Sequence, residues 1–164
     1  MATPTSSTRT QALLTLFDMH TRFFKRAIED IKDEDAYNRL NTPANHIAWL
    51  AGSTVSQRYR MCSETHPGQH QNGEDLFKDN KGIQEGAKYP SMAEYISDWE
   101  KITPMAREAL VKIDDKKLDS EFNMGPMKMT YYDLISFTIY REATLIGQLA
   151  LWRRLLNYPA LKYD

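Results

Sequence analysis

Apolar residues recur at intervals of three and four along four long stretches of the chain, which is the spacing of α-helices that bury one face. The stretches run from about residue 8 to 32, 42 to 64, 91 to 113 and 131 to 156. No run of alternating apolar and polar residues is long enough to predict more than a trace of sheet. Four amphipathic helices bury their faces most simply against one another, so the pattern predicts an all-α four-helix bundle.

Residues with helix-capping chemistry mark where three of these helices are expected to begin. Thr42 is a suitable N-cap, and Pro43 would occupy the first helical position, where its missing N–H is no loss. Ser91 and Glu94 form a capping box ahead of the third helix. Thr130 is the expected N-cap of the fourth helix.

Two connections are longer than the usual turn between packed helices. Residues 66–90 hold four of the seven glycines, and the part from 74 to 84 is expected to form a short extra helix. Residues 114–128 form the other long connection. Pro104 falls inside the third helix and is expected to kink or split it, because proline removes one backbone hydrogen bond and crowds the preceding turn.

Length and charge restrict the classes of protein to which the chain belongs. A chain of 164 residues fits one domain, spanning 1–164. The net charge is -1 and no long basic run is present, so we expect no nucleic-acid partner. No apolar run approaches the roughly 18 residues of a membrane span, so we expect no membrane partner. The lone Cys62 cannot form an internal disulfide, which favours a reducing compartment and predicts a cytoplasmic protein.

Three stretches, taken in order, resemble the DinB/YfiT-like superfamily of bacterial four-helix bundles. The second helix contains NTPANHIAWLAGSTVSQRY, the long connection ends in KYPS, and the fourth helix and its tail read FTIYREATLIGQLALWRRLLNYPALKY. The resemblance covers essentially the whole chain, and its most specific part is the ending IGQLALWRRLLNYPALKY. It implies an up-down-down-up arrangement of the four helices.

The resemblance also implies where a metal would be held. Family members carry three histidines for one divalent metal, in patterns like W-x-x-G-H on the second helix and H-E-x-x-H-x-G-Q on the fourth. This chain has Ser53, Arg141 and Leu145 at those three positions. Leucine has no donor atom and arginine is a permanent cation, so the set cannot hold a divalent ion. We therefore expect a degenerate member with no metal and no other cofactor.

The candidate ligand pocket surrounds this lost metal position. Its residues are His46, Trp49, Ser53, Arg141, Leu145 and Gln148. The helical spacing places Arg141 on the inward stripe of the fourth helix, whose other members are Leu134, Phe137, Thr138, Leu145, Gln148, Trp152 and Leu155. A buried guanidinium needs a partner. The partner is either a carboxylate, for which the candidates are Asp18, Asp98 and Glu142, or an anionic ligand held in bidentate fashion.

Two histidines lie on candidate inner faces of the first and second helices. His20 and His46 would form a displaced metal or acid–base site if they met, and they are otherwise two histidines satisfied by hydrogen bonds in or beside the core. Cys62 is expected to be a structural free cysteine rather than a nucleophile.

Three functions remain open from the sequence, and it identifies no catalytic residue. The first is a binding or interaction protein that has lost the family's metal site. The second is a metal-independent binder or enzyme that uses Arg141 to hold a small anionic group. The third is a metal-dependent hydrolase or thiol S-transferase with rearranged ligands. A homodimer fits the resemblance, since members of the superfamily often pair through helix faces.

Overall fold

The computed structural model describes residues 7–124 and 127–164, so the first six residues of the expected domain lie outside it. Within the described residues the chain is mostly helical, with one short hairpin. Its long helices are α1 Thr8–Ile28, α2 Ile47–Met61, α3 Met92–Val111 and α5 Tyr131–Leu155. The short elements are α4 Asp115–Asp119, the strands β1 Glu121–Met124 and β2 Met127–Thr130, and the 3-10 turns η1 Asp35–Tyr37, η2 Glu74–Leu76 and η3 Lys78–Asn80.

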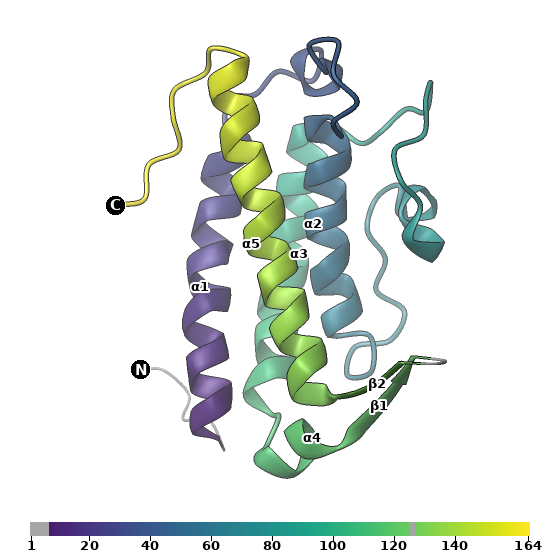
Figure 1. Ribbon diagram of the computed structural model, residues 1–164, viewed down its shortest axis with the longest axis vertical. Helices are drawn as coiled ribbons and strands as arrows, with labels where there is room; N and C mark the ends of the chain where they lie inside the picture. Colours follow the sequence, from purple (N-terminus) through teal and green to yellow (C-terminus); the bar gives the residue numbers. More distant parts are fainter. Residues whose placement is uncertain (1–6, 125–126) are drawn as a thin grey trace.

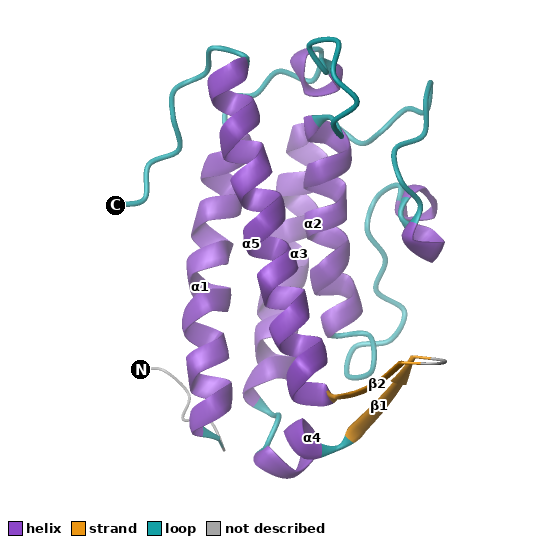
Figure 2. Cartoon of the chain, viewed as in Figure 1, coloured by secondary structure: helices purple, strands orange, loops and turns teal. Residues whose placement is uncertain are grey.

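The long helices lie side by side, with α1 and α5 running in one direction and α2 and α3 in the other (Figure 1). Both α5 and α3 pack against α1 and α2. The antiparallel hairpin of β1 and β2 lies at one end of the helices, between α4 and α5 (Figure 2). The prediction of an all-α chain is therefore confirmed. No helix in the described part of the chain is long and apolar enough to cross a membrane.

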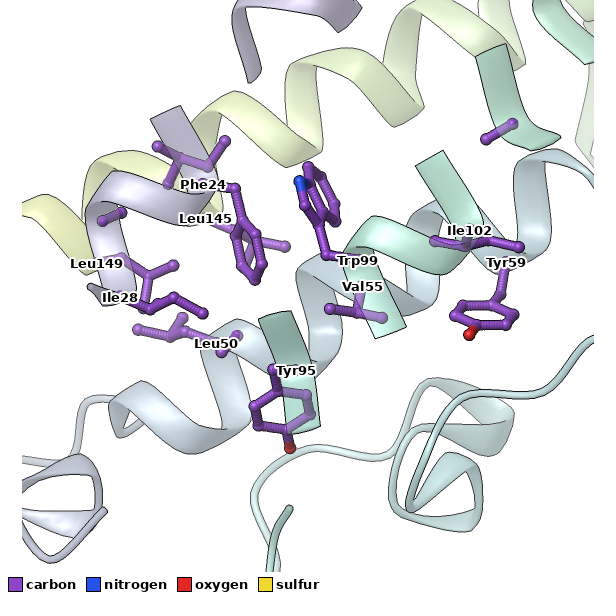
Figure 3. Packing of buried hydrophobic residues seen from close by; sticks show 14 of the residues in the cluster. Phe24, Ile28, Leu50, Val55, Tyr59, Tyr95, Trp99, Ile102, Leu145 and Leu149 are labelled. Carbon is purple, nitrogen blue, oxygen red and sulfur yellow. The ribbon is translucent and has the colours of Figure 1, made fainter. Parts of the chain in front are cut away.

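The core forms between the long helices, each of which contributes large apolar side chains. Figure 3 shows Phe24 and Ile28 of α1, Leu50 and Val55 of α2, Trp99 and Ile102 of α3, and Leu145 and Leu149 of α5. The rings of Phe24 and Trp99 are in contact, with centroids 4.3 Å apart. This core explains why helices of modest intrinsic stability hold together, since packing of their apolar faces supplies most of the stability of helices in proteins.

Two helix boundaries differ from the prediction for the same physical reason. α1 ends at Ile28 rather than near residue 32, and Asp30 beyond it adopts a left-handed φ of 61°. α2 begins at Ile47 rather than at Pro43, because Leu40 and Asn41 are also left-handed and turn the chain. The Thr42 hydroxyl donates to the Arg39 carbonyl in that turn instead of capping a helix. These residues reverse the chain before α2 can start.

The N-caps of α3 and α5 were predicted correctly, whereas the two long connections differ from the prediction in opposite ways. Ser91 and Glu94 cap α3, and Thr130 caps α5. α3 is not split at Pro104, whose exposed position lets water satisfy the carbonyl that its missing N–H leaves unpaired. The helix expected within 74–84 is only the turns η2 and η3, because Asp79 has a φ of 55°. The 114–128 connection contains α4 and the hairpin.

The inward face of α5 was predicted only in part: Leu145 and Trp152 are buried as expected, but other members of the predicted stripe are not. Phe137 and Leu155, which were expected to point inward, are 57% and 47% exposed, and Gln148 is also exposed. The buried positions of α5 are Ile135, Ile139, Glu142, Leu145, Ile146, Leu149, Trp152 and Arg153. Because α5 is apolar on both sides, its periodicity does not say which side faces the core.

Candidate functional site

The buried cation of this protein is Arg58 on α2, which the sequence did not single out. Its side chain is fully buried, and so is that of Glu142 on α5. Arg58 Nε donates to Glu142 Oε1 at 3.0 Å, and Nη2 donates to Oε2 at 3.3 Å. Two parallel bonds of this kind form the strongest common geometry between a guanidinium and a carboxylate. Glu142 therefore pairs with Arg58 and not with Arg141.

The remaining donors of Arg58 reach the other two long helices. Nη1 donates to the hydroxyls of Thr21 and Thr103, each at 2.8 Å, and Nη2 donates to the Phe17 carbonyl at 3.1 Å. All five N–H groups of the guanidinium thus have acceptors. The guanidinium carbon also lies 3.6 Å from the centre of the Trp99 ring. Burial lowers the pKa of Arg58, and the carboxylate of Glu142 opposes that shift. This site is structural and closed.

The other carboxylates considered as partners for Arg141 are also engaged elsewhere. Asp18 accepts two hydrogen bonds from Arg107, at 2.9 and 3.0 Å. Asp98 accepts from the backbone N–H of Asn72 at 2.7 Å. Within the part of the chain that the structure describes, Arg141 therefore has no ion-pair partner.

The two candidate histidines have separate surroundings. His20 Nδ1 lies 3.3 Å from Glu142 Oε2, but both oxygens of that carboxylate are already bonded to Arg58. His46 is the N-cap of α2: its Nδ1 accepts the N–H of Trp49 at 3.1 Å, and its ring packs against Tyr89. Among the described residues, no three His, Cys, Asp or Glu side chains are grouped so that they could hold a metal ion.

A hollow between α2, α5 and the connection that follows α2 brings several of the predicted residues together. Its cavity volume is about 20 Å³, room for about one or two water molecules, and it is partly open to solvent. Its lining consists of Trp49, Ser53, Ser56, Gln57, Arg60, Phe77, Asn80, Lys81 and Arg141. Three of these side chains are cations, and none of the described lining residues is an aspartate or a glutamate. The hollow is therefore a small polar site with a positive charge excess.

Arg141 is held weakly in this hollow, as is Lys81, whose Nζ donates one hydrogen bond to the Asp75 carbonyl at 3.3 Å. Arg141 Nη2 donates only a long hydrogen bond, 3.4 Å, to the Ser53 hydroxyl. Arg60 is anchored more firmly, since it donates to the Phe77 carbonyl at 2.9 Å and to Asn80 Oδ1 at 3.0 Å. Burial, and to a smaller extent the guanidinium of Arg141, lower the pKa of Arg60. The two guanidinium groups repel each other across a site that has no counter-charge in its lining.

One residue of the lining, Trp49, carries a buried donor without an acceptor. Trp49 is 8% exposed, and in the described part of the chain its Nε1 has no hydrogen-bond partner. A buried N–H that is not satisfied costs free energy, typically about 1–3 kcal/mol.

Half of the predicted pocket residues line the hollow. Trp49, Ser53 and Arg141 do, whereas His46 caps a helix, Leu145 is buried in the core and Gln148 is exposed. The sequence missed Arg60 and Lys81. Arg60 had a usable signal, because it follows Ser53 by seven residues and so shares a helix face with it. Lys81 had none, since it directly follows the short turn η3, where no helical periodicity relates it to Ser53.

Cys62 does not have the surroundings of a nucleophile. Its thiol is buried and lies 3.6 Å from the Tyr59 carbonyl, to which it donates. Burial raises the pKa of the Cys62 thiol, which lowers the fraction of reactive thiolate. The residue is a structural cysteine at the end of α2.

The capping role of His46 predicts a specific pH dependence of stability. Burial lowers the pKa of His46 in the folded chain, so below the unfolded value of about 6.5 the unfolded chain binds more protons. Stability due to His46 is therefore present near pH 7 and is lost as the pH falls through the folded pKa. Asparagine caps helices but does not titrate. We expect His46→Asn to lose less unfolding free energy than the wild type between pH 7 and pH 5, measured by urea denaturation.

An alanine variant separates capping from titration. His46→Ala should lose about 1 kcal/mol at pH 7, which is the usual cost of an N-cap. Equal pH dependence in His46→Asn and the wild type would contradict the assignment of the titrating group.

These geometric facts stand without support from known relatives. A scan against models of protein families found none that matches the chain, and a search of curated proteins found no significant match.

Proposed function

We propose that this chain binds one small anionic group in the hollow, with Arg141 as the principal anchor and without a metal. The observation that carries the proposal is that Arg141, Arg60 and Lys81 line one hollow whose described lining has no carboxylate. The three carboxylates that might have neutralised Arg141 are bonded to other groups. This favours a ligand-binding role over an interaction protein in which the lost metal site is simply filled.

The donors in the hollow suit an oxyanion. A guanidinium offers two parallel N–H groups, which match the two oxygens of a carboxylate or phosphate. The hydroxyl of Ser53 adds a neutral donor. The cavity volume of about 20 Å³ is far below the roughly 300 Å³ at which sites for drug-sized ligands begin. The hollow therefore suits only the carboxylate or phosphate end of a molecule that extends through the open side, or an inorganic anion that stays partly in solvent.

We also propose that the chain is one domain, an up-down-down-up four-helix bundle of the DinB/YfiT-like class that has lost its metal. The directions of the long helices support this (Figure 1). The contact between Ser53 and Arg141 supports it as well, because these residues stand where two of the family's metal-binding histidines are expected. In this proposal an anion site has replaced a cation site at the same place between α2 and α5.

Calorimetric titration with phosphate, sulfate and acetate tests the proposal. The titration is done at low ionic strength, because salt screens contacts between the anion and the arginine. We expect at least one of these anions to bind. Arg141→Ala should raise its dissociation constant at least about tenfold, because the variant loses one charge-assisted hydrogen bond. Arg141→Lys should retain part of the affinity, since it keeps the charge but not the bidentate geometry.

Arg22 provides the matched control, because it is an exposed arginine on α1 and does not line the hollow. Arg22→Ala removes the same charge and should bind like the wild type. Absence of binding to all three anions, or equal losses in Arg141→Ala and Arg22→Ala, would show that the hollow is not an anion site.

A further inference from the structure

The three cations of the hollow come from three separate segments of the chain. Arg60 belongs to α2, Arg141 to α5, and Lys81 to the connection that follows α2. All three side chains line one hollow, although like charges repel each other. Burial and, after it, the guanidinium of Arg141 lower the pKa of Arg60. The described lining thus places three positive charges around a single small cavity and offers no negative charge.

The acidic side chains near Lys81 in the sequence do not cancel its charge. Asp79 is exposed and does not line the hollow. The other acidic residues of this stretch are paired with other cations: Glu74 and Asp75 with Lys78, and Glu85 with Arg39. Within the described residues, Lys81 donates one hydrogen bond, 3.3 Å, to the Asp75 carbonyl. A lysine has three N–H donors, so two donors of Lys81 are left for a ligand.

We propose that the hollow binds the doubly charged phosphate group of a small phosphate monoester, a ligand class that rests on the proposed function, and that Lys81 determines the preference for the second charge. A carboxylate has one charge and two oxygens in one plane, which a single guanidinium can match. A phosphate monoester carries about -1.5 to -2 charges at pH 7 and has three terminal oxygens that point in different directions. Cations from three segments match the phosphate better than the carboxylate.

The small cavity limits recognition to the phosphate group itself. A volume of about 20 Å³ holds one or two water molecules, so one or two phosphate oxygens enter it. The remaining oxygens face the open side, where the exposed Lys81 lies. The alcohol part of the ester stays in solvent. Binding therefore depends on the charge and the free oxygens of the phosphate, and a phosphodiester, with one charge and a second alkyl group, should bind weakly.

Methyl phosphate and methyl sulfate test the second charge. The two ions have the same tetrahedral shape, but at pH 8 methyl phosphate carries two charges and methyl sulfate one, because the second pKa of a phosphate monoester is about 6. In calorimetric titrations of the full chain at low ionic strength, methyl phosphate should bind at least about tenfold more tightly than methyl sulfate. Inorganic phosphate should bind within about threefold of methyl phosphate, because the ester oxygen faces solvent.

The variant Lys81→Met tests which residue contacts the second charge. It should reduce the preference for methyl phosphate over methyl sulfate to less than about threefold, whereas Arg141→Ala should weaken the binding of both ions. Lys88→Met is the matched control, because Lys88 is an exposed lysine of the same connection and does not line the hollow. It should keep the preference of the wild type. Circular dichroism checks that each variant folds.

Loss of the phosphate preference and loss of the anion site give different results. Equal affinities for methyl phosphate and methyl sulfate would overturn the preference for two charges and leave the anion site intact. A full preference in Lys81→Met would overturn the role of Lys81. Inorganic phosphate that binds at least about tenfold more tightly than methyl phosphate would overturn the monoester and assign the hollow to the free ion. If none of these ions binds, the proposed anion site fails as well.

Discussion

Replacing Arg58 by methionine is expected to lower the free energy of unfolding by about 3–5 kcal/mol, a large part of the stability of a typical domain. The variant leaves Glu142 fully buried without its bidentate partner. It also leaves the hydroxyls of Thr21 and Thr103 without the N–H groups that they accept. Urea denaturation of the two proteins measures the difference.

A second substitution shows whether the unpaired carboxylate of Glu142 causes the loss of stability in Arg58→Met. The double variant Arg58→Met/Glu142→Leu removes both charges from the core and should recover most of the lost stability. Arg22→Met changes an exposed arginine and should stay within about 0.5 kcal/mol of the wild type. If the double variant is no more stable than Arg58→Met, the loss comes from packing rather than from the buried carboxylate.

Gly52→Val is expected to be the next most damaging change, with a loss of about 3 kcal/mol. A Cβ at this position of α2 would lie 2.1 Å from Phe77 Cζ and 2.6 Å from the Tyr95 hydroxyl. Both rings belong to buried side chains, so the chain must shift them to make room. Thermal unfolding of the two proteins under the same conditions measures the loss.

Gly147→Val is the matched control, because nothing lies within 4 Å of a Cβ built on Gly147. Its stability should change by less than about 0.5 kcal/mol, since valine and glycine differ little in helix propensity. Similar losses of stability in both variants would mean that valine destabilises the helix backbone itself, rather than that it displaces the rings of Phe77 and Tyr95. Gly52→Val should also weaken anion binding, because Phe77 lines the hollow and its carbonyl accepts from Arg60.

The existence and approximate length of the long helices could be predicted from apolar spacing and capping residues. The capping boxes at Ser91 and Thr130 placed two helix starts correctly, because a cap is a local interaction between neighbours in sequence. The start of α2 was missed because Leu40 and Asn41 adopt left-handed backbone conformations. Leucine and asparagine do not indicate a left-handed conformation in a sequence as strongly as glycine does.

The orientation of α5 could not be predicted, and neither could the buried ion pair. Both faces of α5 are apolar, so the choice between Arg141 and Glu142 as the inward residue depends on what the neighbouring helices offer. That partner is Arg58, which lies 84 positions away in sequence. No local pattern marked Arg58 as buried, and arginine is usually exposed.

The hollow was only partly predictable for a related reason. Trp49, Ser53 and Arg141 occupy regular helices, so their proximity follows from helix geometry once the helices pair. Lys81 lies on the connection after α2. The course of that connection depends on Phe77, which packs into the space that Gly52 leaves free. Such long-range fits are properties of the folded chain rather than of the sequence near Lys81.

Arg58 touches every long helix, and this has a consequence for how the protein comes apart. It is part of α2, and its guanidinium reaches Thr21 of α1, Thr103 of α3 and Glu142 of α5. If one of these helices moved away, Arg58 would lose an acceptor or its counter-charge inside the core. Because partial opening would cost free energy at this one shared residue, we expect the long helices to unfold as a single cooperative unit rather than one at a time.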